Sequence, residues 1–249
     1  MEQNNQQLEE LEVMNILIIY AHPEPKSFNG ALKDLAVSEL TSLGHHVKVS
    51  DLYTMNFKAV AGREDFIELQ NDKFFKYAVE QKNAVKTKGF SKDIEEEQEK
   101  LLWADFVIFQ FPLWWYSVPA ILKGWFDRVF ASGFIYSGDM RYDTGGLKGR
   151  KAMLSITTGS PKHAYTPFGM DGDIHEKILY HINHGMLYFS GMEPVEPFIA
   201  WTPSHDEEDR QMYLERYKER LNRLTEIPSI RYHSSTNYGP DHQLKDKYR

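Results

Sequence analysis

Three consecutive aromatic residues, Trp114, Trp115 and Tyr116, lie between Pro112 and Pro119 in the middle of the chain. Three bulky rings in a row cannot all point into one core. We therefore expect at least one of them to line a pocket, where it can stack on an aromatic ring system. The alternative is that the rings fill the core, which is the commoner place for a single tryptophan.

A second segment, 157–165, combines polar groups with residues that can move a proton. It begins with Thr157, Thr158 and Gly159, whose hydroxyls and accessible backbone can bond the polar edge of a heterocycle. His163 and Tyr165 follow, and both are candidate proton donors.

A third segment, 22–29, precedes a predicted helix. Lys26 supplies a cation there, and Ser27 and Asn29 supply short polar side chains. Together with the free N–H groups of a helix start, these residues indicate an anion site. The segment is neither a G-x-G-x-x-G turn nor a P-loop. The alternative is an ordinary capped helix start.

Five apolar runs predict the strands that position these segments: 16–21, 47–49, 106–111, 152–156 and 195–200. Helical spacing alternates with them at 31–40, 91–103, 119–131, 174–189 and 206–224, with helical pieces at 72–81. This alternation is typical of a doubly wound parallel sheet, and we expect the flavodoxin-like order 2-1-3-4-5. Ligands of such sheets lie beyond the carboxyl ends of the strands, where the three polar and aromatic segments converge. The combination favours a flavin over a nicotinamide as the resident cofactor.

Composition excludes several other classes of protein. The chain has 249 residues, a net charge of -7 and no basic block, which argues against nucleic-acid binding. It contains no cysteine, so any redox chemistry needs an organic cofactor. His181 and His184 lack a suitably spaced acidic or cysteine partner, and we expect no metal site.

No run approaches the roughly 20 apolar residues of a membrane span. The N-terminus does not look like a signal peptide, so a cytoplasmic protein is expected. We expect a disordered lead at 1–14, one domain at 15–227 and a polar tail at 228–249.

The stretch 104–130 carries the most specific resemblance to a known family. Its runs 109–113 and 118–126 read FQFPL and VPAILKGWF, and LSITTG at 154–159 supports them. Over roughly 15–224 the chain resembles the flavodoxin-like NAD(P)H:quinone oxidoreductases. That resemblance implies an FAD-containing homodimer in which NAD(P)H delivers a hydride and a quinone, or another aromatic acceptor, then takes its place. Whether FMN replaces FAD stays open.

The resemblance also implies roles for individual residues. Tyr165 matches an active-site tyrosine, and Tyr136 matches a tyrosine that borders the substrate pocket. Arg210 falls near a residue at the adenine end of the cofactor. The remaining cofactor contacts implied are His22, Ser27, Phe28, Asn29, Leu113, Trp114, Trp115, Tyr116, Thr157, Thr158 and Gly159.

The chain departs from the family at several of these positions. Asp171 replaces a catalytic histidine, and an ionised aspartate cannot donate a proton. Either Asp171 is held neutral, or His163 takes over, or water supplies the proton. Gly138 replaces a second pocket tyrosine, and Lys76 replaces a glutamine that contacts the flavin. A short tail replaces the C-terminal domain of the mammalian members.

Two other functions stay open on the sequence. One is an ancillary flavoprotein that regulates a membrane transporter such as a potassium-efflux system. The other is an electron carrier that resembles flavodoxin.

Overall fold

The computed structural model describes residues 13–204 and 206–249, and it contains one five-stranded parallel sheet. The strands are β1 (Asn15–Tyr20), β2 (His46–Asp51), β3 (Phe106–Pro112), β4 (Lys151–Thr158) and β5 (Glu193–Trp201). Their order is β2-β1-β3-β4-β5, and every neighbouring pair is parallel. The predicted fold class and strand order are therefore confirmed. The predicted lead at 1–14 lies outside the described residues up to residue 12.

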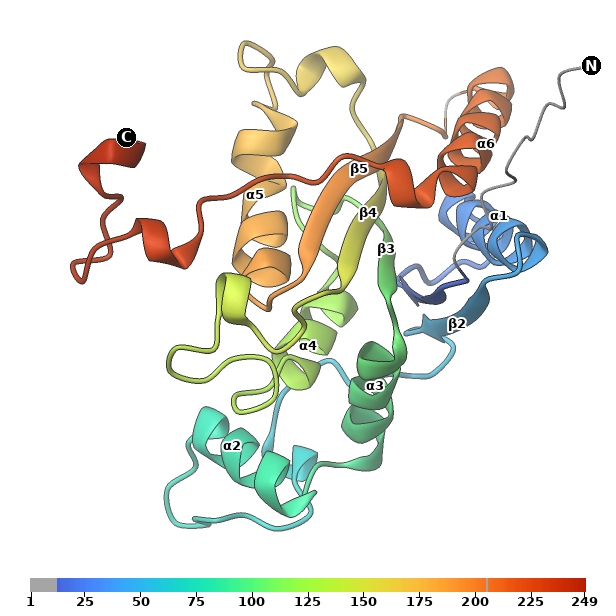
Figure 1. Ribbon diagram of the computed structural model, residues 1–249. Helices are drawn as coiled ribbons and strands as arrows, with labels where there is room; N and C mark the ends of the chain where they lie inside the picture. Colours follow the sequence, from blue (N-terminus) through green and yellow to red (C-terminus); the bar gives the residue numbers. More distant parts are fainter. Residues whose placement is uncertain (1–12, 205) are drawn as a thin grey trace, which may run out of the picture.

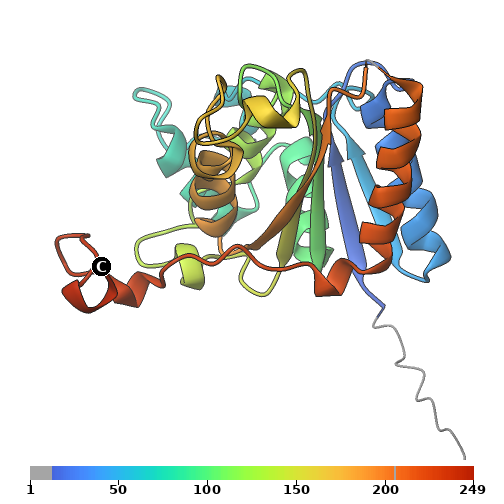
Figure 2. The same cartoon turned by 90° about the horizontal axis from the view of Figure 1, so that it is seen from above.

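Helices cover both faces of the sheet, as Figures 1 and 2 show. On one face lie α1 (Phe28–Ser42) and α6 (Glu207–Asn222), which pack side by side. On the other face lie α3 (Lys92–Trp103), α4 (Ala120–Val129) and the segment around α5 (Tyr180–Ile182).

Alternate residues of the central strands divide between the two cores. In β1, Ile16 and Ile18 pack in the cluster under α1 and α6, whereas Leu17 and Ile19 pack in the cluster under α4. All four are fully buried. This two-sided burial is why the strand sequence is continuously apolar instead of alternating.

Most helix boundaries agree with the predictions, but two do not. The helix predicted at 174–189 is divided into π-helical segments, Ile174–Ile178 and Asn183–Tyr188, around the single α-helical turn of α5. The helical piece predicted at 72–81 is displaced to α2 (Tyr77–Thr87). The Asn71 carboxamide accepts bonds from the amides of Lys73 and Phe74, and such local bonding competes with a helix start.

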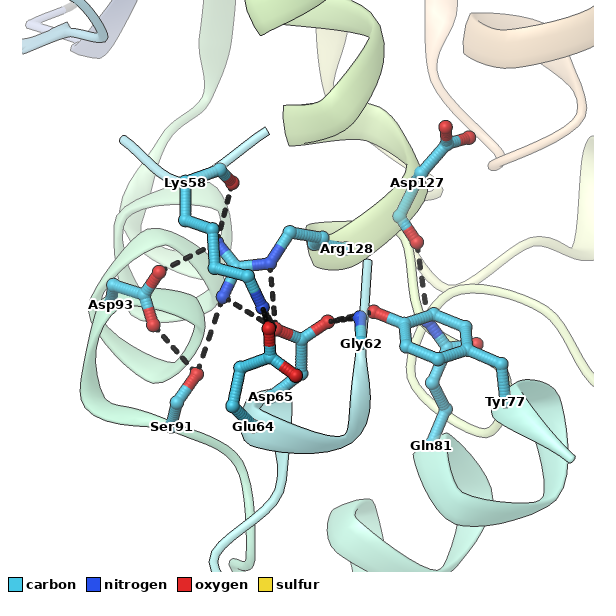
Figure 3. A network of polar contacts seen from close by, with 10 residues as sticks. All are labelled: Lys58, Gly62, Glu64, Asp65, Tyr77, Gln81, Ser91, Asp93, Asp127 and Arg128. Atoms are coloured by element: carbon cyan, nitrogen blue, oxygen red, sulfur yellow. Dashed lines mark hydrogen bonds and ion pairs between the residues drawn. The ribbon is translucent and has the colours of Figure 1, made fainter. Parts of the chain in front are cut away.

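A buried ion-pair network attaches the polar segment 56–90 to α4 (Figure 3). The Arg128 guanidinium donates to Asp65 Oδ1 at 3.0 Å and to Asp93 Oδ2 at 2.6 Å. The Tyr77 hydroxyl donates to the second oxygen of Asp65 at 2.7 Å. Arg128 and Asp65 are almost fully buried, so each depends on the other for compensation of its charge. For this segment, only the helical pieces at 72–81 were predicted from the sequence.

The segment 228–249 leaves the sheet beside β5. Ile230 N–H donates to the carbonyl of Pro194 at 2.8 Å, and Glu196 N–H donates to the carbonyl of Pro228 at 2.9 Å. Farther on, the chain runs out along the side of the body and ends in short turns (Figure 2). Within the described part of the chain, none of the helices has the length and apolar character needed to cross a membrane.

Candidate functional site

The predicted binding segments meet at the carboxyl ends of β1, β3 and β4. Asn29, in the first turn of α1, is buried and donates from Nδ2 to Thr157 Oγ1 at 2.9 Å. Its carbonyl oxygen accepts a bond of 2.9 Å from Gln110 Nε2. Leu113 N–H donates to the carbonyl of Thr157 at 2.8 Å. These bonds join the loops that the sequence analysis placed together only by topology.

The aromatic residues form a tight turn directly after the carboxyl end of β3, the central strand. Backbone bonds of 3.1 and 3.0 Å between Trp114 and Ser117 close the turn. Trp115 and Tyr116 have φ of 50° and 58°, which is the left-handed pair of a type I′ turn. Trp115 is 95% exposed, and Trp114 and Tyr116 are also exposed. The core-filling alternative is therefore wrong, and the rings are available to stack on a ligand.

The start of α1 is the segment in which the sequence predicts an anion site. Ser27 caps the helix by accepting a bond from Gly30 N–H at 3.2 Å. The first turn contains no acidic residue, whereas the first turn of α6 contains Glu207, Glu208 and Asp209. A helix start without acidic side chains keeps its positive end available to a bound anion.

The loop before α1 folds tightly against the helix. A Cβ on Gly30 would lie 1.9 Å from the carbonyl oxygen of Pro25, so a larger residue does not fit. His22 Nδ1 accepts from Glu24 N–H at 3.0 Å, and its ring lies 6.1 Å from that of Trp114. The loop before α1 and the aromatic turn are thus adjacent.

The loop after β4 supplies the candidate proton donors. Thr158 Oγ1 donates to the carbonyl of Ser160 at 2.9 Å, and a Cβ on Gly159 would meet no atom within 4 Å. The backbone at Gly159 is therefore open to a ligand. Tyr165 is buried, with its ring 5.3 Å from that of Trp201. Burial raises the pKa of Tyr165, a bond with Ser160 opposes this shift, and the charge of Asp171 adds to it.

Asp171 and His163, the other candidates in this loop, have different surroundings. The Tyr116 hydroxyl donates to Asp171 Oδ1 at 2.9 Å, and this bond raises the pKa of Tyr116. His163 is exposed, and within residues 13–204 and 206–249 its ring makes no hydrogen bond. The pairing of Tyr116 with Asp171 was not foreseen, because 54 residues lie between them along the chain and no sequence pattern links the two positions.

Arg210 lies at the same edge of the sheet. It is in the first turn of α6, next to α1, and donates to the carbonyl of Pro203 at 3.1 Å while pairing with Glu207. It does not contact the aromatic turn or the loop after β4 in any bond of the described residues.

Tyr136 lies elsewhere in the chain. It follows α4, which at ten residues is about 15 Å long and begins next to the aromatic turn. Its ring is 5.6 Å from that of Phe189, and it lines a cavity of about 520 Å³ with Phe126, Phe130 and residues of α2. Within one chain, Tyr136 and the three binding loops are therefore at different ends of the sheet.

Two site features escaped the sequence analysis. Gln110, which holds Asn29, is a lone polar residue within the apolar run of β3, and that isolation was the available signal. His181 Nε2 lies 3.0 Å from Ser117 Oγ and braces the aromatic turn.

His184 instead stacks on Tyr180 at 4.8 Å. Among the described residues, the structure brings together no group of three His, Asp or Glu side chains that could hold a metal.

Comparison with known proteins agrees with this geometry. The model of a family with a flavodoxin-like fold matches residues 14–221. The chain belongs to this flavodoxin-like family. The match covers all five strands and both helix layers, and it ends within α6.

The similar proteins in this family are quinone dehydrogenases and reductases. Ribosyldihydronicotinamide dehydrogenase [quinone] of Rattus norvegicus is 48% identical over 208 residues, which are 83% of this chain and 90% of the relative. NAD(P)H dehydrogenase [quinone] 1 of the same species is 44% identical over 87% of this chain and 79% of its own. A candidate quinone reductase from Klebsiella pneumoniae has a solved structure with a TM-score of 0.90 and 41% identity, over 94% of this chain and 95% of its own. The comparisons give no support to a transporter subunit.

Proposed function

We propose that this protein is a flavin-dependent NAD(P)H:quinone oxidoreductase that carries FAD and acts as a cytoplasmic homodimer. The observation that carries the proposal is the meeting of three loops at one edge of the sheet, joined through Asn29 and Thr157. The relatives that share the fold are quinone dehydrogenases, which supports the same activity. Bound flavin would take a hydride from NAD(P)H and pass it to a quinone or another aromatic acceptor.

The protein would bind the cofactor with backbone groups and short polar side chains. The start of α1, with His22, Ser27, Phe28 and Asn29, suits the diphosphate because it combines free N–H groups with the positive end of the helix. Arg210, at the start of the neighbouring α6, suits the adenine end.

The aromatic turn and the loop after β4 would enclose the ring system. Trp114, Trp115 and Tyr116 offer exposed rings on which a flat tricyclic ligand could stack, and Leu113 would add backbone groups. Thr157, Thr158 and Gly159 face the same edge and suit its polar heterocycle. The buried phenol of Tyr165 would serve as the proton donor, and Asp171 lies beside it.

A homodimer accounts for two features that a single chain leaves unexplained. Trp115, Phe168 and Met170 are at least 95% exposed on the two loops that border the site. Large apolar residues gathered in this way favour contact with another protein surface. If Tyr136 borders the substrate pocket, it must reach the site from a second copy, since its own chain places it at the other end of α4.

Two experiments test these proposals. Mass spectrometry of the cofactor released from purified protein should detect FAD; release of FMN alone would contradict the choice of cofactor.

For the dimer, Tyr136→Ala and Tyr165→Phe chains can be co-expressed with different tags and the mixed species isolated. Turnover in the mixed dimer well above that of either variant alone is expected. Mixed dimers no more active than the parents would exclude a site shared between two copies.

A further inference from the structure

Tyr116 and Asp171 are joined across the mouth of the site, and each is fixed by its own loop. Tyr116 occupies the left-handed position of the turn that the two Trp114–Ser117 bonds close. Asp171 is held by its backbone, since its N–H donates to the carbonyl of Ala164 at 3.0 Å. The 2.9 Å bond between the two side chains therefore connects two loops, each of which is held by its own backbone hydrogen bonds.

Tyr165 completes this cluster. Its ring lies 6.5 Å from that of Tyr116 in an edge-on arrangement and 5.3 Å from that of Trp201. The charged and titratable groups nearby include Lys162 and His163 in the turn before Tyr165, Lys177, whose side chain lies close to Gly172, and His181, which bonds the neighbouring Ser117. The Asp171 carboxylate is partly exposed, and its Oδ1 accepts the hydrogen bond that the Tyr116 hydroxyl donates.

We propose that Tyr116 is a positioning residue: its hydroxyl holds the Asp171 carboxylate beside Tyr165, where the carboxylate adds to the effect of burial in opposing ionisation of Tyr165 and keeps its hydroxyl as a hydrogen-bond donor to the ligand. The inference rests on the proposed function for the identity of that ligand. The Tyr116 hydroxyl already donates to Asp171, whereas the Tyr165 oxygen accepts the bond from Ser160 and keeps its own proton for a further bond. A neighbouring cation would favour the phenolate of Tyr165, but a carboxylate opposes it. A protonated histidine at position 171 would favour the phenolate of Tyr165, whereas the carboxylate of Asp171 would disfavour it.

The test uses protein without cofactor, so that it does not depend on turnover. Tyrosine is labelled with ¹³C at Cζ, the Tyr165 resonance is assigned by its loss in Tyr165→Phe, and its titration is followed toward alkaline pH. Asp171→Asn should lower the pKa of Tyr165, because the opposing charge is gone. Tyr116→Phe should lower it as well, because the carboxylate is no longer held in place. The double variant should go no further than Asp171→Asn. Tyr248→Phe, in the C-terminal segment, is the matched control and should change nothing.

An unchanged Tyr165 titration in Tyr116→Phe would overturn the positioning role, and an unchanged titration in Asp171→Asn would overturn the whole cluster. Circular dichroism confirms that each variant is folded, which is expected because both side chains lie at the surface. FAD binding to wild-type protein is measured separately. Its failure would count against the proposed function, while the tyrosine titration would still decide this inference. In the holoenzyme, the alkaline limb of kcat/KM against pH should move to lower pH in both variants.

Discussion

The carboxamide of Asn29 donates a 2.9 Å hydrogen bond to the hydroxyl of Thr157, across 128 residues of sequence and within the buried edge of the sheet. This bond joins the start of α1 to the end of β4, and Gln110 holds the other end of the same carboxamide. The two halves of the proposed flavin site are thus one hydrogen-bonded unit, and not two neighbouring loops.

Replacement of Asn29 by alanine should weaken both the fold and the site. It leaves buried polar groups of Gln110 and Thr157 without their partner, which costs about 1–3 kcal/mol. Urea denaturation should show a loss of that size, and FAD should bind more weakly. Asn83→Ala, a half-buried asparagine on α2, is the control and should change flavin affinity little. Equal flavin affinity in Asn29→Ala and wild type would contradict the role of this bond in the site.

Replacement of Trp115 by glycine should separate stability from binding. Its left-handed backbone is costly for a bulky side chain, by roughly 1–3 kcal/mol, and glycine adopts that conformation without strain. Since the side chain is 95% exposed, little packing is lost. The thermal midpoint should therefore stay equal or rise, while the affinity for flavin falls. A variant that unfolds more easily than wild type would show that the ring stabilises the chain itself.

Tyr165→Phe should slow quinone reduction more than Asp171→Asn does. Removal of the Tyr165 hydroxyl takes away a hydrogen-bond donor, with an effect on the order of 10²-fold if it assists proton transfer. Asp171→Asn keeps that hydroxyl and alters only its surroundings. Steady-state kcat with a quinone acceptor decides between them. Small and equal effects would show that neither side chain takes part in proton chemistry.

The network around Arg128 should govern acid stability. Burial would raise the pKa of Asp65, but bonds from Arg128, Lys58 and Tyr77 outweigh it and lower the pKa. A lowered pKa contributes stability above the unfolded value of about 3.9, and this stability is lost as the pH falls through the folded pKa. Arg128→Met should cost about 3–5 kcal/mol at neutral pH, because it leaves the Asp65 charge buried and unpaired.

Denaturation curves at several pH values test this account of the network. The difference between wild type and Arg128→Met should shrink as the pH falls below the unfolded value of about 3.9, because the unfolded chain then binds a proton at Asp65 that the folded wild type does not yet bind. Arg223→Met breaks an exposed pair with Glu226 and is the control, because a solvent-screened pair contributes little to stability at any pH. A difference that stays constant down to the acid limit would contradict the assignment to Asp65.

The fold was predictable because apolar periodicity directly encodes it. The fully buried runs of β1 and β3, and Gly44 with its φ of 88° after α1, are local signals that survive without tertiary information. The convergence of Asn29, the aromatic turn and Thr157 followed from one rule on parallel sheets. What the sequence could not supply were pairings between distant segments, such as Arg128 with Asp65 and Tyr116 with Asp171. Those depend on how loops of irregular backbone are packed.

The central claim is that the joined loops bind a flavin that NAD(P)H reduces and a quinone reoxidises. Anaerobic stopped-flow absorbance of the purified holoprotein tests it most directly. We predict that NADH or NADPH alone, without any partner reductase, bleaches the visible flavin band, and that addition of a quinone restores it. A protein that stays colourless when offered FAD or FMN, or a bound flavin that neither nicotinamide bleaches, would contradict the claim.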